Sequence, residues 1–284
     1  MIARAYGDGT LVFDRDAIVR AALHAYVEGS IIHVDPLHRL AITASAEPYW
    51  KGDVQRGAFY NGNGSGSYDV VAWTSAGVVG LAWELGWGPI EQLDLAVSAV
   101  TRGPDDVRAA VPGLPVELLP AFLLAVDMLQ DGGTYGEKLA GVGFWFDGAH
   151  VGGSLFDDPT AEGANRLVAW GALQDGRLPL LCDPDTVAVW AEEHVRRGAA
   201  PIQALVDAVV TRALTGPTEL TTAEVETLLP TPPDARRLLA TQRRLQKVGI
   251  TWPGSPEIPP EPPPGPNPFL PQSEALSSSG ATCS

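Results

Sequence analysis

The sequence has no long apolar run, only two cysteines and fewer basic than acidic residues. Its most apolar long stretch, residues 114–129, is interrupted by two prolines and two carboxylates, and the N-terminus has no apolar run of signal-peptide length. Cys182 and Cys283 are too few for a disulfide framework. We therefore expect a cytoplasmic protein that neither spans nor binds a membrane.

Basic residues are scarce in this chain. The 284 residues include 19 Lys and Arg against 34 Asp and Glu, which gives a formal net charge of −15. Nucleic-acid affinity comes mainly from cations that displace counterions, so this charge argues against a nucleic-acid partner. The same negative field would attract a basic protein and speed its encounter. The simpler interpretation is that acidity keeps the protein soluble.

The common catalytic motifs are incomplete. Gly62, Gly64 and Gly66 begin like a dinucleotide-binding loop, but Ser67 stands where the pattern requires its last glycine, and the next element is a predicted strand. The same loop lacks the spacing of a serine nucleophile elbow, and a hairpin end accounts for Ser154 beside His150. We expect no cofactor.

One cluster resembles a metal site. His33, Asp35 and His38 place two imidazoles and a carboxylate within six residues. A metal site would need another strong ligand from elsewhere in the chain. The same spacing also suits a strand end followed by a turn. The enzymatic alternative is therefore a metal-assisted hydrolase that uses these three residues.

Periodicity and turn signals predict an α+β fold, with an antiparallel sheet of hairpins packed by helices. A first helix is expected over residues 16–28, with His24 and Glu28 on its solvent side. Short strands follow, the first over residues 31–34. Two hairpins are predicted, one turning at Gly77 and one at Asp147-Gly148.

The C-terminal half reads as helices. One opens at Pro201 with a continuous apolar stripe, Thr221 and Glu224 form a capping box, and a last helix runs from about Asp234 to Val248 with a basic face. We predict one globular domain over residues 1–252, β-rich to about 150 and helical over 155–250. A disordered Pro- and Ser-rich tail is expected over 253–284.

The glycine-rich loop and the chain after the second strand of its hairpin are the candidate binding segments. Polar side chains in the loop would offer exposed hydrogen-bonding groups, and tryptophans can anchor contacts with a partner. Flexible connection is the alternative interpretation of the loop. The candidate binding residues are Asn61, Asn63, Ser65, Ser67, Trp83, Glu84 and Trp87.

The stretch from Tyr60 through the glycine-rich loop to Gly77 resembles a family of uncharacterised bacterial proteins, in which a Gly-Ser-Gly loop leads into two strands joined by a glycine turn. Residues 112–115, 144–146 and 185–197 are similar to later parts of that family. Its members resemble immunity or accessory proteins of toxin loci, which implies binding. The family carries an acidic–His–acidic cluster after the second strand; residues 83–87 here lack the histidine, so no activity is carried over.

These observations favour a non-enzymatic, acidic binding protein that occludes a basic partner, such as a bacterial toxin domain. The first alternative is the metal-assisted hydrolase described above. The second is a structural or assembly component that docks through its C-terminal tail, over residues 253–284. Neither the partner nor the oligomeric state follows from the sequence.

Overall fold

The structure of the chain is a computed structural model. It describes residues 2–6, 9–13, 15–32, 34, 48–62, 67–84, 107–132, 142–154, 192, 196, 198–228 and 234–258. Of the part expected to be helical, residues 155–197 lie outside these ranges apart from two single positions. So does most of the expected tail.

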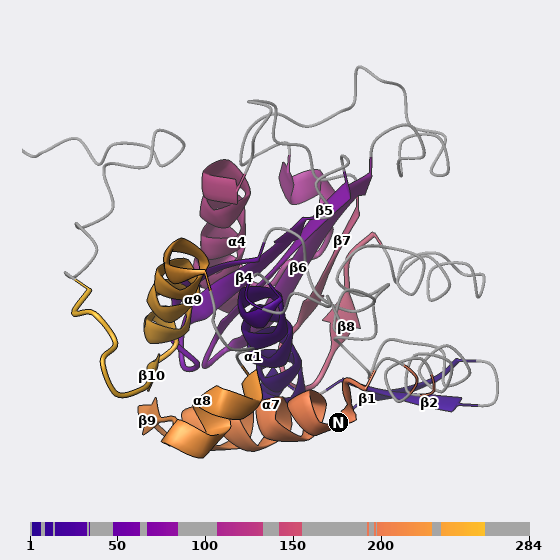
Figure 1. The fold of residues 1–284 in the computed structure, drawn as a ribbon. Helices are drawn as coiled ribbons and strands as arrows, with labels where there is room; N and C mark the ends of the chain where they lie inside the picture. Colours follow the sequence, from indigo (N-terminus) through magenta and orange to yellow (C-terminus); the bar gives the residue numbers. More distant parts are fainter. Residues whose placement is uncertain are drawn as a thin grey trace, which may run out of the picture.

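A six-stranded antiparallel sheet forms the centre of the fold, with its strands in sequence order from β3 to β8 (Figure 1). Each strand therefore pairs with its neighbour along the chain. An N-terminal hairpin and a short parallel pair make two further sheets. The strands of the main sheet are β3 (Tyr49–Gly52), β4 (Gly57–Gly62), β5 (Ser67–Thr74), β6 (Gly77–Glu84), β7 (Val142–Phe146) and β8 (Val151–Gly152). This arrangement confirms the α+β class.

Alternating side chains of the sheet serve two separate apolar cores. Phe59 and Trp73 belong to the core on the side of α1 (Arg15–Ile31), whereas Tyr60 and Ala72 belong to the core under α4 (Leu119–Gly132). Strands whose successive side chains point to opposite faces produce this division. The sheet is therefore covered on both faces, as Figure 1 shows.

The first helix is longer and more buried than its sequence predicts. It extends from Arg15 to Ile31, and further helices pack on the side away from the sheet, so nearly the whole of its surface is covered. Glu28 is consequently buried, with 2% of its area exposed, and the expectation that it faces solvent is wrong. The expected strand over residues 31–34 is also wrong, because Ile31 ends the helix and Ile32 and Val34 lie in turns.

Both predicted hairpins are confirmed. β5 and β6 pair from Ser67–Glu84 to Thr74–Gly77, and Gly77 has the positive φ that the turn requires, at 144°. β7 and β8 are joined through Asp147 and Gly148, whose φ is 91°. Turn chemistry therefore sets both connections.

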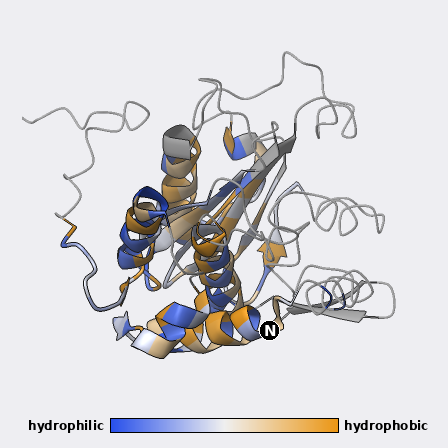
Figure 2. Ribbon diagram, viewed as in Figure 1, coloured by the Kyte–Doolittle hydropathy of each residue, from blue (hydrophilic) through white to orange (hydrophobic). Residues whose placement is uncertain are grey.

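Three helices lie between residues 200 and 247 in the described C-terminal part, where the sequence predicts them. The apolar stripe of α7 (Ala200–Ala213) is packed into the core. The capping box precedes α8 (Thr222–Leu228), with the Thr221 amide donating to Glu224 at 2.8 Å. Asp234 accepts from the amide of Arg237 and caps α9 (Ala235–Lys247). In Figure 2, α9 has a hydrophilic side and a hydrophobic side.

Short segments complete the described structure. Strands β9 (Thr218–Glu219) and β10 (Ile250–Thr251) pair in parallel, and α8 and α9 lie between them in the sequence. The N-terminal hairpin is β1 (Ile2–Tyr6) with β2 (Gly9–Phe13). Two 3-10 turns precede α4, η2 (Arg108–Ala110) and η3 (Val116–Leu118). Within the described ranges, none of the helices combines the length and apolarity that crossing a bilayer requires.

Candidate functional site

The two ends of the central sheet differ in how the chain connects its strands. At one end, here called the turned end, residues 53–56, 75–76 and 147–150 make short links within three hairpins. At the other, here called the open end, β4 finishes at Gly62, β6 finishes at Glu84 and β7 begins at Val142. Residues 63–66 link β4 to β5 at this end, and two longer connections, residues 85–106 and 133–141, follow β6 and precede β7. Long connections carried by a rigid sheet are where binding residues concentrate.

The strand register brings together the two segments that contain the candidate binding residues. Ser67 pairs with Glu84, Tyr68 with Trp83, and Gly62 with Tyr68. The loop that leads into β5 and the chain that follows β6 are therefore attached to neighbouring strands at the open end. Asn63, Ser65 and Trp87 lie outside the described residues.

Asn61 is not the exposed loop residue that the sequence predicts. β4 continues through it, and it is buried, with 6% of its area exposed. Its register partner on β5 is Asp69, which is itself only 3% exposed. By the alternation of the strands, both side chains face the α1 side of the sheet, where Phe59 and Val71 also point.

Asp69 is a buried polar residue near the candidate site that the sequence reasoning missed. It occupies a position where the pattern of β5, with Val71 and Trp73 on the same face, calls for an apolar side chain. A polar residue at an apolar register position is the signal that could have identified it. A buried carboxyl next to a buried amide at the open end is the main polar interruption that we identify in the described part of the α1 face.

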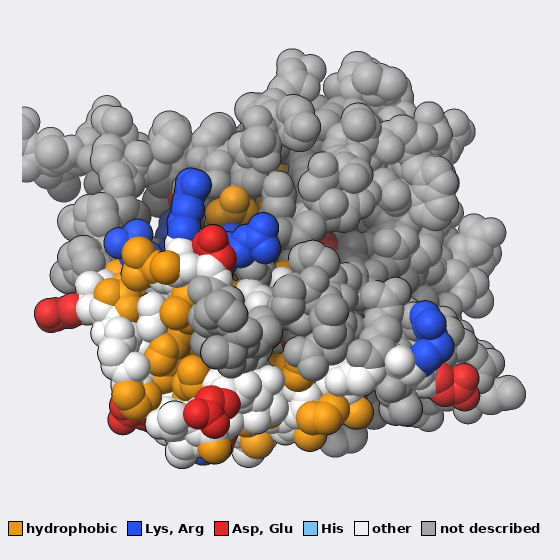
Figure 3. All heavy atoms as spheres, in the orientation of Figure 1, with side chains coloured by type: hydrophobic (Ala, Val, Ile, Leu, Met, Phe, Trp, Pro, Cys, Tyr) orange, Lys and Arg blue, Asp and Glu red, His pale blue; other side chains and the backbone are white. Residues whose placement is uncertain are grey.

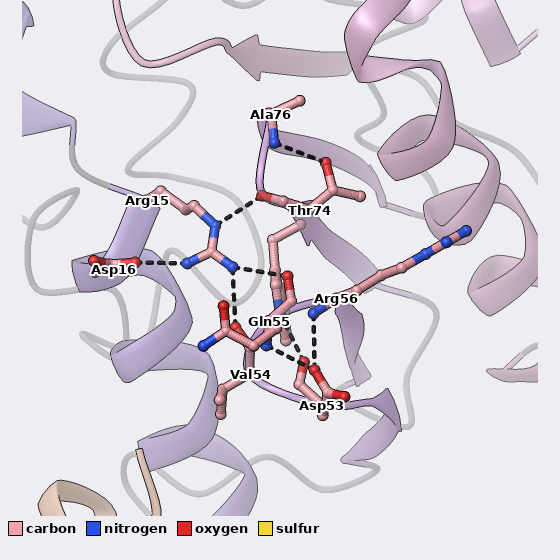
Figure 4. Close-up of polar contacts among 9 residues, drawn as sticks. Arg15, Asp16, Asp53, Val54, Gln55, Arg56, Thr74 and Ala76 are labelled. Carbon is pink, nitrogen blue, oxygen red and sulfur yellow. Dashed lines mark hydrogen bonds and ion pairs between the residues drawn. The ribbon is translucent and has the colours of Figure 1, made fainter. Parts of the chain in front are cut away.

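A guanidinium bridges two of the three links at the turned end (Figure 4). Arg15 donates from Nε to the carbonyl oxygen of Thr74 at 2.7 Å, and from its second terminal nitrogen to those of Val54 and Gln55. Its first terminal nitrogen pairs with Asp16 at 2.6 Å. The planar fork of arginine suits such divergent acceptors. We assign Arg15 to fixing α1 on two turns of the sheet.

A second polar cluster joins α1 to α7. His24 Nε2 lies 3.2 Å from Asp207 Oδ1, and His24 Nδ1 lies 3.8 Å from the buried carboxyl of Glu28. His24 is thus half-buried instead of solvent-facing. The hydrogen bond from His24 holds the pKa of Asp207 below its usual range, although partial burial acts in the opposite direction. The cluster lies between packed helices, which is a structural position.

The hairpin of β7 and β8 accounts for the histidine and serine near residue 150. The Ser154 hydroxyl donates to the Ala110 carbonyl at 2.8 Å and accepts from the Gly143 amide at 3.1 Å. Burial raises the pKa of Asp147, but hydrogen bonds from the amides of His150 and Ala149 outweigh it and leave that pKa lowered. The Asp147 contacts lie within the hairpin turn, whereas Ser154 ties the chain after β8 to Ala110 and to the start of β7.

His33, Asp35 and His38, the three residues of the metal hypothesis, lie outside the described residues. Elsewhere in the described ranges, no three His, Cys, Asp or Glu side chains are grouped so that they could hold a metal ion. The metal-like cluster therefore remains a sequence prediction.

Charge is divided unevenly along the chain. Most of the excess acidic residues belong to segments outside the described ranges, among them Glu91, Asp94, Asp105 and Asp106, which follow β6. Basic side chains instead gather over the region of α9, as Figure 3 shows at the upper left of the described surface. The exposed members on that helix are Arg236, Arg237, Arg243 and Lys247.

Comparison with known proteins finds no matching family model, no similar curated sequence and no similar solved structure.

Proposed function

We propose that this protein is a non-enzymatic binding protein that uses the open end of its sheet to occlude a basic partner, in the manner of an immunity protein that covers a toxin domain. The observation that carries this proposal is the pairing of Ser67 with Glu84. It unites two separate candidate segments at one end of a rigid sheet. The opposite end is occupied by short turns and by Arg15.

The sign of the charge supports a basic partner. The chain that follows Glu84 contains four carboxylates and one arginine before the next described residue, Val107. The whole chain carries a net charge of −15. Complementary charge raises the rate at which two proteins meet and discriminates against partners of the wrong sign.

The polar side chains of the described residues also support a role in binding, because their contacts serve to hold the fold together. Arg15, Ser154 and Asp147 each satisfy backbone groups in turns. His24 and Asp207 connect two helices. Among these five residues of the described part, no nucleophile is paired with a base that could activate it. We therefore assign them to the scaffold that presents the open end.

The test is a capture experiment with matched variants. Immobilised full-length protein is exposed to lysate and secreted material of the source cell at about 100 mM salt, and a retained basic protein is purified and titrated back. We expect Glu84→Lys to weaken its affinity at least tenfold. Glu226→Lys, the same charge reversal on the exposed surface of α8, should change affinity less than twofold.

Several results would overturn the proposal. Retention of no basic protein at low salt would contradict it, as would equal loss of affinity in both variants. Stoichiometric zinc or iron in the purified protein, lost in a His33→Ala, His38→Ala double variant, would favour the metal-assisted hydrolase instead.

A further inference from the structure

The basic surface of α9 is the strongest charged feature of the described molecule. At 3.6 residues per turn, Arg236, Arg243 and Lys247 fall along one line of the helix, with Arg237 and Arg244 beside it. Leu245 on the opposite side is buried in the core. Within the described ranges, we find no carboxylate paired with Arg236, Arg237 or Arg243. A row of positive charges attracts an acidic segment.

The chain itself returns to this helix. After β10, Trp252 and Ser255 exchange hydrogen bonds that reverse the backbone, and Trp252 is buried. The Gln246 side chain, in the last turn of α9, then donates to the Pro256 carbonyl at 2.5 Å. In Figure 1 the yellow segment beyond β10 rises on the same side of the molecule as α9. The tail therefore starts beside the last turn of the basic helix.

The composition of the tail complements the helix. From Gly249 to the last residue printed, the chain contains three glutamates and no lysine, arginine or aspartate. Glu261 stands between Pro259-Pro260 and Pro262-Pro263-Pro264. Proline-rich sequence favours the extended polyproline II conformation, so less chain entropy is lost when such a segment binds.

The rise per residue of polyproline II and of the α-helix places one carboxylate of the tail opposite the N-terminal end of the row of basic residues on α9. From Pro256 to Glu261, five residues of polyproline II cover about 15 Å, and from Gln246 to Arg236, ten residues of α-helix also cover about 15 Å. With Pro256 fixed at Gln246 and the segment antiparallel to α9, Glu261 comes level with Arg236 and Arg237.

From these observations we infer that the tail beyond Ile258 docks on the basic face of α9, with Glu261 paired with Arg236 or Arg237. Because the tail is tethered where the helix ends, its effective concentration at this face is high. The docked tail offsets part of the positive charge of this surface. This inference is independent of the proposed function.

Zero-length crosslinking tests the inference in the full chain. Arg236→Lys, and separately Arg237→Lys, keeps the charge and supplies an amine that a carbodiimide can couple to a carboxylate in direct contact. Peptide mass spectrometry of the monomer should find position 236 or 237 joined to Glu261 at about 50 mM salt. We expect the yield to fall at least threefold at about 500 mM salt, where the screening length is shorter.

The controls distinguish docking from general collapse of the chain. Arg108→Lys places the same amine on an exposed site away from α9 and should give no link to Glu261. Glu261→Gln should abolish the product. Absence of the product in both lysine variants would overturn the inference. So would equal coupling of Glu274, which indicates an unspecific tail, or coupling found only in covalent dimers, which indicates a second copy.

Discussion

The Tyr26 hydroxyl donates to the carbonyl oxygen of Arg244 at 3.0 Å, which ties the middle of α1 to the last turns of α9. A second contact between the same helices runs from the Thr241 hydroxyl to the Ser30 carbonyl at 2.9 Å, in a fully buried position. The basic helix is therefore anchored to the core by two polar contacts between residues more than 200 positions apart in sequence. Its charged side stays available on the surface.

Replacing Tyr26 with phenylalanine tests the first of these contacts. Tyr26→Phe keeps the ring packed against Trp50 but removes a donor and leaves the Arg244 carbonyl without it. We expect the free energy of unfolding to fall by about 1 kcal/mol, the usual net value of such a bond. Urea denaturation measures it. Tyr49→Phe, on a ring with 46% of its area exposed, should change stability by less than about 0.5 kcal/mol.

Gly77 and Gly148 should respond differently to the same substitution. A Cβ at Gly77 would collide with the Phe146 carbonyl oxygen, whereas a Cβ at Gly148 meets nothing within 4 Å. Both glycines have positive φ. We expect Gly77→Ala to destabilise by about 3 kcal/mol or more, from collision and backbone strain together, and Gly148→Ala by about 1 kcal/mol from strain alone. Equal losses in thermal unfolding would show that close approach to Phe146 does not restrict the residue at position 77.

The pH dependence of stability should report on His24 and Asp207. A carboxyl whose pKa is lowered in the folded state stabilises the fold above its ordinary pKa, and this stabilisation is lost as the pH falls through the lowered value. Asp207→Asn should cost about 0.5 kcal/mol at pH 7, because the group is largely exposed. The difference from the parent protein should shrink below about pH 4.

The control for that series is Glu226→Gln, which removes a charge of the same sign from the exposed surface of α8. Its unfolding free energy should follow that of the parent protein across the whole pH range. A difference for Asp207→Asn that stays constant down to about pH 2, below the ordinary pKa of an aspartate, would show that His24 does not stabilise the ionised carboxylate.

The capping box of α8 makes a local prediction. Thr221 and Glu224 bond to each other's backbone amides, at 3.3 and 2.8 Å. Thr221→Ala removes one acceptor for the amides at the start of the helix and should destabilise by about 1 kcal/mol. Thr222→Ala, one residue into the helix and exposed, should stay within about 0.5 kcal/mol in the same denaturation assay.

Local signals in the sequence predicted the parts of the fold that depend on neighbouring residues. Gly77, Asp147-Gly148 and the Thr221–Glu224 box each act over a few positions, and the structure places a turn or helix start at each of them. The buried polar residues could not be predicted in the same way. Glu28 is covered because α7 and α9 pack over α1, and no residue close to Glu28 in the sequence indicates that contact.

The candidate site was predicted in separate pieces. Sequence patterns indicated a polar loop near residues 61–67 and an aromatic, acidic stretch at 83–87. The strand register supplies their proximity at the backbone. Asn61 was placed on the wrong side of the loop boundary, because β4 extends two residues further than its apolar pattern suggests. Strand ends depend on pairing with a neighbour, which a single strand's sequence does not contain.

The contrast between the turned end and the open end bears on how this chain can be altered. An added residue between Thr74 and Gly77 would change a two-residue hairpin link and with it the pairing of β5 with β6. Additional residues between Glu84 and Val107 would leave every described strand pair as it is. The described sheet therefore tolerates length variation at that connection without any change in its strand pairing.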